Sequence, residues 1–282
     1  MSATVAPVAD ALWVTVRVEG SANREGVIGA LFAAGSTGLH EDGQAIITHF
    51  PPGTSVELLM NSIAAADPAA TVRIGEAFPT DWSAWRAAVG SHRLGAVTVA
   101  PPWLASSTPG DTTVIIEPAM AFGTGEHPTT RSVIRLMQKI PVPLGMVADL
   151  GAGSAVLSIA AAKLGSQRVA AVELDHDAIG NAEQNIAANG VAGRVQLIEG
   201  DAALMLPLLA PVEVVLANII SSVLKELLPI IVSSVRTGGH AILSGLLAEE
   251  RAMMLEAIGI ADWRIAAEDT EEAWWSVLLE RR

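Results

Sequence analysis

Apolar and polar residues in the first part of the chain follow a pattern that predicts a series of short elements. Residues 13–19, WVTVRVE, alternate as a strand does, and residues 22–35 have the apolar spacing of a helix. Two short strands then flank a turn at Asp42-Gly43, which is a sequence typical of hairpins. The segment TSVELLMNSIAAA, residues 54–66, begins with helix-capping residues, and TVRIGEAF, residues 71–78, predicts a further strand.

The order of these elements is strand, helix, strand, strand, helix, strand, which is typical of a ferredoxin-like α+β domain. We assign this domain to residues 1–78. Residues 79–95 follow as a linker helix, in which Trp82 and Trp85 lie three positions apart on one face. We expect these two indoles to pack against a domain.

Residues 96–282 form a second predicted domain with a different pattern. Two strands flank a proline-rich turn, and a helix is predicted from Thr129 to about Ile140. From Met146 onward, compact apolar strands alternate with helices, and two strands end the chain. This alternation predicts a parallel, doubly wound α/β sheet with a terminal antiparallel hairpin.

Residues at the carboxyl ends of the predicted strands are candidates for a binding site, because ligands of doubly wound sheets bind at that edge. They are far apart along the chain, so only the parallel topology would bring them together. These residues are Gly151, Glu173, Asp201, Asn218 and Gly245.

Composition narrows the possible chemistry. The chain has no cysteine, which excludes thiolate nucleophiles, disulfides and cysteine-bound metals, and it has no tyrosine. None of its six histidines lies at metal-ligand spacing from another, so we expect no metal site. The formal net charge of −13 argues against DNA binding and is compatible with a basic protein partner. Without a run of about 20 apolar residues or a secretory signal, we expect a cytoplasmic protein that binds no membrane.

The strongest local motif is VADLGAGSAVL, residues 147–157. A buried strand leads into a turn with Gly151 and Gly153, and a helix begins just beyond, so backbone amides point at a ligand. Glu173 ends the next strand, where its carboxylate can accept hydrogen bonds from both hydroxyls of a ribose. Val156 stands where a dinucleotide motif has its third glycine, which favours a nucleoside without pyrophosphate, such as S-adenosylmethionine. The alternative is an ordinary strand–helix turn.

Each of two further strand-end residues has two possible roles. Asp201 could accept a hydrogen bond from an adenine amino group, or it could cap the helix that follows it. Asn218 could orient a nucleophile through its amide carbonyl, or it could simply form a turn.

Five strings carry a resemblance to a known family. They follow one another at the family's intervals and read EPAMAFGTGEHPTT, VADLGAGSAVLSIAAAKLG, AAVELDHDAIGNAEQNIAANGV, VVLANIISSVLKELLPII and LSGLLAEE. With them the chain resembles the bacterial PrmA family, the methyltransferases of the large-subunit ribosomal protein eleven. The resemblance covers residues 80–282 by motif and the preceding region by pattern.

The resemblance implies a class I, Rossmann-like methyltransferase with a seven-stranded doubly wound sheet, preceded by a small substrate-recognition domain. It implies transfer of methyl groups from S-adenosylmethionine, without a metal, to lysine side chains and the N-terminal amine of the ribosomal protein, whether free or in the ribosome. S-adenosylhomocysteine would be the product. By matching position, the cofactor would be held by Thr130, Gly151, Glu173 and Asn218. The loop that would cover it consists of Phe122, Gly123, Thr124 and Gly125.

Several residues depart from the family's pattern. Ala155 replaces the usual third glycine with a residue whose methyl group is small, and Glu173 replaces the usual aspartate. His176 stands where proline is usual. Glu126 adds a negative charge in the loop, and the sequence assigns it no role.

Asn218 is the candidate catalytic residue, since it could guide the attacking amine, and no general base is identified. One alternative is a protein-lysine methyltransferase with another target. A nucleic-acid methyltransferase is less favoured, because the segment Asn218-Ile219-Ile220-Ser221 lacks the aromatic residue that stacks on a flipped base. A non-catalytic module that binds S-adenosylmethionine is the third alternative.

Overall fold

The computed structural model describes residues 13–36, 39–42, 45–50, 54–77, 89–105, 112–117, 123, 125–259 and 262–282. The chain divides into two compact units, one within residues 1–88 and the other within residues 89–282. Residues 79–88 of the predicted linker helix, which the sequence pattern predicts over 79–95, lie outside the described residues, and His92–Leu94 within the rest of it form a strand and not a helix. Within the described ranges, no helix is both long and apolar enough to cross a membrane.

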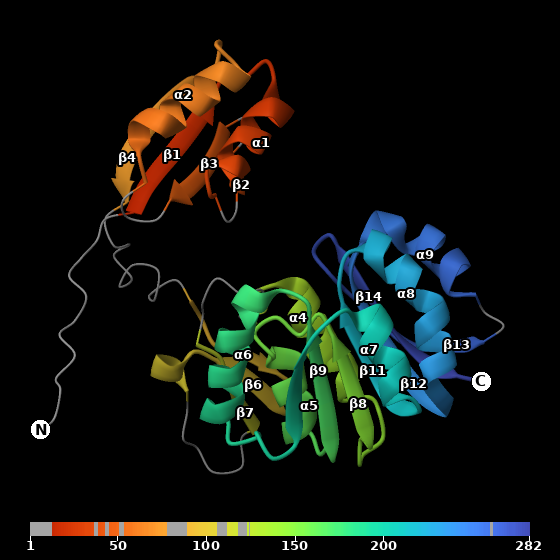
Figure 1. The fold of residues 1–282 in the computed structure, drawn as a ribbon. Coiled ribbons are helices and arrows are strands. Elements are labelled where there is room, and N and C mark those ends of the chain that lie inside the picture. The colour runs from red at the N-terminus through yellow and green to blue at the C-terminus, as the bar shows by residue number, and fades with distance from the viewer. Residues whose placement is uncertain are drawn as a thin grey trace, which may run out of the picture. The chain divides into compact units, whose positions relative to one another are not determined.

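The first unit is a four-stranded antiparallel sheet with two helices (Figure 1). Its elements are β1 (Trp13–Glu19), α1 (Arg24–Ala33), β2 (Leu39–Asp42), β3 (Ala45–Phe50), α2 (Val56–Ala66) and β4 (Thr71–Ala77). The strands lie in the order β2-β3-β1-β4. Val16 and Ile46 of the strands share one buried core with Leu31 of α1 and Leu59 of α2. Both helices therefore cover the same face of the sheet.

The second unit is built around a seven-stranded sheet. Its strands are β8 (Met146–Leu150), β9 (Arg168–Glu173), β10 (Val195–Glu199), β11 (Val212–Asn218), β12 (Val235–Leu247), β13 (Trp263–Glu271) and β14 (Trp274–Arg281). They lie in the order β10-β9-β8-β11-β12-β14-β13. The first five in this order are parallel, and β14 runs antiparallel to both of its neighbours. The predicted parallel sheet with a terminal antiparallel hairpin is confirmed.

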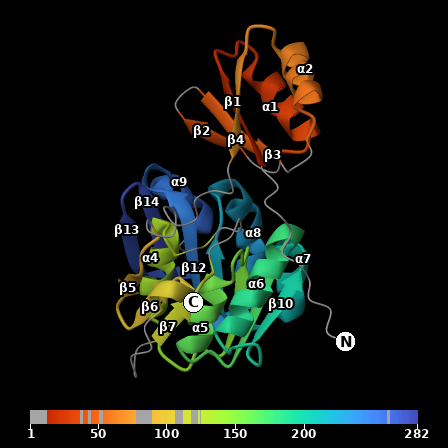
Figure 2. The same cartoon turned by 90° about the vertical axis from the view of Figure 1, so that its left-hand side faces the viewer.

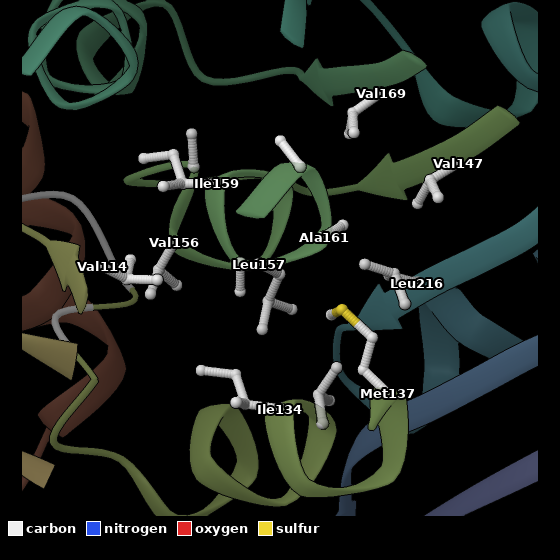
Figure 3. Packing of buried hydrophobic residues seen from close by; sticks show 14 of the residues in the cluster. Val114, Ile134, Met137, Val147, Val156, Leu157, Ile159, Ala161, Val169 and Leu216 are labelled. Atoms are coloured by element: carbon white, nitrogen blue, oxygen red, sulfur yellow. The ribbon is translucent and has the colours of Figure 1, made fainter. Parts of the chain in front are cut away.

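Helices cover both faces of this sheet. They are α4 (Pro128–Met137), α5 (Val156–Lys163), α6 (His176–Ala188), α7 (Ala202–Leu209), α8 (Ser221–Ser234) and α9 (Arg251–Ile258). The first three share one core with one side of the strands, and the last three share another core with the opposite side (Figures 1 and 2). Within the first core, Ile134 and Met137 point from α4 toward Leu157 of α5 (Figure 3).

A small sheet precedes α4 in the sequence. It consists of β5 (His92–Leu94), β6 (Val97–Ala100) and β7 (Thr112–Ile115), of which the sequence pattern predicts only the last two. The predicted helix to Ile140 ends at Met137 instead. Beyond Met137 the backbone turns more tightly, since Lys139 N and Ile140 N bond carbonyls three residues back, and Pro141 follows. The Gln138 side chain bonds Leu94 O at 2.7 Å and Ala96 N at 2.8 Å. The end of α4 therefore fixes the β5–β6 hairpin.

In the first unit, one carboxylate joins the start of α1 to the end of α2. Asp67 accepts hydrogen bonds from Asn23 N and Ser21 Oγ, each at 2.8 Å, and from Ala69 N at 2.9 Å. These donors, the Asn23 amide first, lower the pKa of Asp67 to about 2. A carboxylate with a depressed pKa stabilises the folded state above its unfolded pKa of about 4, and that contribution is lost as the pH falls toward 2.

We therefore expect the protection of α1 amides from hydrogen exchange to fall between pH 4 and pH 2. In the Asp67→Asn variant, the loss of protection on acidification should be smaller, because the side-chain amide does not titrate and has one acceptor atom in place of two. Exchange of residues 24–33, corrected for the intrinsic rates, measures the effect. Equal pH dependence in the two proteins would contradict this account of Asp67.

Candidate active site

The predicted strand-end residues lie along one edge of the large sheet. Glu173 closes β9 and pairs in register with Glu199 of β10. Gly151 directly follows β8, and Asn218 closes β11, where it pairs with Ser244 of β12. This arrangement follows from the parallel topology, which places the carboxyl ends of neighbouring strands side by side.

The glycine turn after β8 is held by the end of β9. Gly151 N and Ala152 N both donate to Val172 O, at 2.9 and 3.0 Å. Gly153 N donates to Glu173 Oε2 at 2.7 Å, and Asp175 N donates to Oε1 of the same carboxylate at 2.8 Å. Glu173 is therefore fixed beside the turn, and its remaining lone pairs are the ones that a ribose could reach.

Ala155, at the end of this turn, has a left-handed backbone with φ of +64°. Such a conformation costs an alanine roughly 1–2 kcal/mol. The departure from glycine at this position is thus a source of strain, which the surrounding hydrogen bonds must offset. Ala155 N donates to Ala152 O at 2.8 Å.

Three polar atoms at this edge are buried and have no hydrogen-bond partner among the described residues. They are Thr130 Oγ1 in the first turn of α4, Asp149 Oδ1 near the end of β8, and Asn218 Oδ1. Register places Asp149 opposite Leu216, two residues before Asn218. Ser244 Oγ, next to Asn218, lies 3.3 Å from Thr129 O and so brings the start of α4 to the same edge. Buried polar atoms are almost always matched, so this set fits a polar ligand.

Asp149 is a site residue that the sequence analysis missed. Its carboxylate is fully buried, and Ser158 Oγ donates to Oδ2 at 2.6 Å. Burial raises the pKa of Asp149 to about 6. The available signal was an acidic residue inside an otherwise apolar strand, MVADL.

The remaining predicted residues are placed as follows. Asp201 caps α7, since its Oδ1 accepts from Ala203 N at 2.7 Å, as one of its two readings requires. Gly123 lies against the glycine turn, where Ser154 Oγ donates to Gly123 O at 2.6 Å. Phe122 and Thr124 lie outside the described residues.

Within the described part of the chain, no group of three or more histidine and acidic side chains could hold a metal ion.

Glu126, to which the sequence assigned no role, connects the loop to the beginning of the second unit. Gly90 N donates to Glu126 Oε1 at 3.0 Å, and His92 Nε2 lies 2.9 Å from Glu126 Oε2. The Arg131 guanidinium of α4 also bonds the Glu126 carbonyl oxygen. The carboxylate of Glu126 thus bonds the backbone and an imidazole of its own unit.

The start of α4 is also tied to β13. Arg131 Nε donates to Glu271 Oε1 at 2.8 Å. One turn later, Arg135 makes a bidentate contact with Asp269, with Nε and Nη2 at 2.8 and 2.7 Å from its two carboxylate oxygens. The Arg135 guanidinium, through this hydrogen bond, holds the pKa of Asp269 below its usual value. These contacts keep Thr130 at the edge of the sheet.

Comparison with known proteins identifies the family. A family model described as "Ribosomal protein L11 methyltransferase (PrmA)" matches residues 9–282. A ribosomal protein L11 methyltransferase of Bacillus cytotoxicus is 31% identical over 271 residues, which cover 91% of this chain and 86% of the relative. One of Geobacter metallireducens is 37% identical over 202 residues, which cover 71% of this chain and only 65% of the relative's length.

Comparison with solved structures identifies the fold of the chain. The crystal structure of ribosomal protein L11 methylase from Lactobacillus delbrueckii subsp. bulgaricus superposes with a TM-score of 0.61 at 26% identity, covering 68% of this chain and 98% of that chain. The class I methyltransferase fold expected from the sequence is therefore confirmed. With a family model that spans nearly all of its residues, the chain belongs to the ribosomal protein L11 methyltransferase (PrmA) family.

Proposed function

We propose that this chain methylates lysine side chains and the N-terminal amine of ribosomal protein L11, with S-adenosylmethionine as methyl donor. The observation that carries the proposal is the set of unmatched buried atoms of Thr130, Asp149 and Asn218, in a chain of the PrmA family. The ammonium, carboxylate and hydroxyl groups of such a ligand would satisfy them. The bound cofactor supplies a methyl group activated on a positively charged sulfur.

Each predicted residue has a part in this proposal. Glu173 and the turn at Gly151 and Gly153 would hold the ribose, and Thr130, Asp149 and Asn218 would hold the methionine end. Asp201, whose Oδ1 caps α7, would use its other oxygen for the adenine amino group. The covering loop would consist of Phe122, Gly123 and Thr124.

Asn218 is held in place by close backbone packing. Ile219 N donates to Ser244 O at 3.1 Å, and a Cβ on Gly245 would lie only 2.6 Å from Ile219 O. Gly245 also has φ of +81°, which glycine adopts without strain. The backbone at Asn218 is therefore fixed, and the amide oxygen of its side chain could accept a hydrogen bond from the attacking amine and direct the nitrogen lone pair.

The surroundings of Asn218 favour a neutral amine. Leu216 and Ile242 precede Asn218 and its register partner Ser244 by two residues, so they share the same face of the sheet, and both are fully buried. An apolar environment disfavours the ammonium form and so lowers the pKa of an entering lysine. Exclusion of water and orientation by Asn218 then suffice for attack on the methyl carbon, without a dedicated general base.

The first unit is proposed to be a ferredoxin-like domain that recognises the ribosomal protein. The element order and the sheet order β2-β3-β1-β4 support this assignment. The linker that allows it to be repositioned would lie within residues 79–95, before strand β5 (His92–Leu94), and residues 96–282 with that strand would carry the catalysis. The net charge of −13 favours a basic partner, which we place in the cytoplasm, either free or in the ribosome.

The direct test uses the purified chain, labelled S-adenosylmethionine and ribosomal proteins from cells that lack the gene. Ribosomal protein L11 should become labelled, and mass spectrometry should locate the methyl groups on lysines and the N-terminal amine. Labelling of another protein while L11 stays unlabelled would show that the substrate is wrong. Absence of transfer to any protein would contradict methyltransferase activity itself.

Replacement of the proposed catalytic amide should affect turnover more than binding. We expect Asn218→Ala to lower kcat by about 100-fold, because the amine loses its orienting acceptor, and to raise the Kd for S-adenosylmethionine by only about tenfold, because one contact to the methionine end is lost. Steady-state kinetics and calorimetry measure the two quantities. Equal losses in both would count against an orienting role.

Replacement of the proposed ribose carboxylate should affect binding first. Glu173→Ala removes a charged acceptor, and we expect the Kd for S-adenosylmethionine to rise by about 10- to 100-fold. Glu173→Gln, which keeps an acceptor oxygen for Gly153 N, should lose less. Unchanged affinity in the alanine variant would remove Glu173 from the ribose site.

A further inference from the structure

Three asparagines on one face of α6 hold the chain segment that leaves β7. Asn189 Oδ1 accepts from Ile115 N at 2.9 Å, and its Nδ2 donates to Ile115 O at 2.6 Å, as a neighbouring strand would. Asn185 Oδ1 accepts from Glu117 N at 2.9 Å, and Asn181 Nδ2 donates to Glu117 O at 3.2 Å. Asn185 and Asn189 are four residues apart along the helix, and the residues that they bond, Glu117 and Ile115, are two residues apart along the extended segment. One helical turn therefore matches two residues of extended chain.

Asn185 differs from Asn189 because it also reaches the glycine turn. Its Nδ2 donates to Ser154 O at 3.1 Å, and its side chain is almost completely buried. Ser154 in turn donates through Oγ to Gly123 O at 2.6 Å. Asn185 is therefore the junction between Glu117, the turn and Gly123.

The Ser154 carbonyl belongs to the peptide unit that precedes the strained Ala155. The N–H of this unit bonds Ala152 O at 2.8 Å, and its C=O accepts from Asn185 Nδ2. A rotation of this peptide would carry Ala155 from φ of +64° toward the region that alanine prefers. The asparagine hydrogen bond opposes that rotation, because the rotated carbonyl would leave the buried Nδ2 with only its longer bond to Asn181 Oδ1, at 3.3 Å.

We propose that Asn185 is a positioning residue for the cofactor site: it locks the Ser154–Ala155 peptide and thereby fixes the turn that receives S-adenosylmethionine. This inference rests on the proposed function. Without Asn185, the turn populates a second conformation in which its backbone no longer has the shape that receives the cofactor. The affinity for S-adenosylmethionine falls because a smaller fraction of the protein has the binding-competent turn. The kcat at saturating S-adenosylmethionine is preserved.

Asn189 provides a matched control on the same helix. Like Asn185, it bonds the backbone of the β7 segment, but no bond from its side chain reaches the glycine turn in the described structure. Asn185→Ala should raise the Kd for S-adenosylmethionine by about tenfold and leave kcat at saturating cofactor within about threefold. Asn189→Ala should lower the Tm comparably but keep the Kd within about twofold.

A second substitution distinguishes a specific effect on the Ser154–Ala155 peptide from a general loss of packing around Asn185. Glycine adopts the left-handed conformation without strain, so Ala155→Gly added to Asn185→Ala should recover most of the lost affinity. Hydrogen exchange of the unliganded chain gives an independent readout. Protection of the Ala155 amide should drop in Asn185→Ala and persist in Asn189→Ala.

Equal rises in Kd for the two asparagine variants, or no recovery with Ala155→Gly, would overturn the proposal. Unchanged exchange at Ala155 in Asn185→Ala would also overturn it. These outcomes differ from failure of the proposed function, in which the unmodified chain itself binds no S-adenosylmethionine or transfers no methyl group to protein.

Discussion

The carboxylate of Glu173 makes the two hydrogen bonds on which the site depends. It bonds Gly153 N with one oxygen and Asp175 N with the other, so the end of β9 joins the turn after β8 to the start of α6. The same helix carries Asn185, which holds the other end of that turn. The turn is thus supported on both sides by one strand–helix connection, and the backbone it presents cannot shift without disturbing both supports.

Much of this arrangement follows from short-range pattern. Alternating strands and helices predict the large sheet, and once the strands are parallel, Gly151, Glu173 and Asn218 must lie on one edge. The predicted order of elements in the first unit is likewise the order that the structure shows. Local capping chemistry explains why Asp201 begins α7, which is one of the two roles that its sequence position allows.

The residues that sequence reasoning missed act through partners far away in the chain. Glu126 bonds Gly90, and Asn185 bonds both Glu117 and Ser154. Asp149 depends on Ser158 and on complete burial, which raises its pKa to about 6. No local periodicity specifies such pairs, since each requires the packing of α4, α5 or α6 to be known first. The strained backbone of Ala155 is indicated in the sequence only by its departure from the glycine that the family usually has at this position.

The contacts between α4 and β13 have a consequence for the order in which the site can be completed during synthesis. Thr130 and its helix leave the ribosome early, but Arg131 and Arg135 find Glu271 and Asp269 only after about 140 further residues have been added. Until then, strands β8 to β12 can pair with one another, while α4 lacks its anchors on β13. The newly made chain can therefore form the parallel part of its sheet before α4 is anchored, and the last hairpin supplies those anchors.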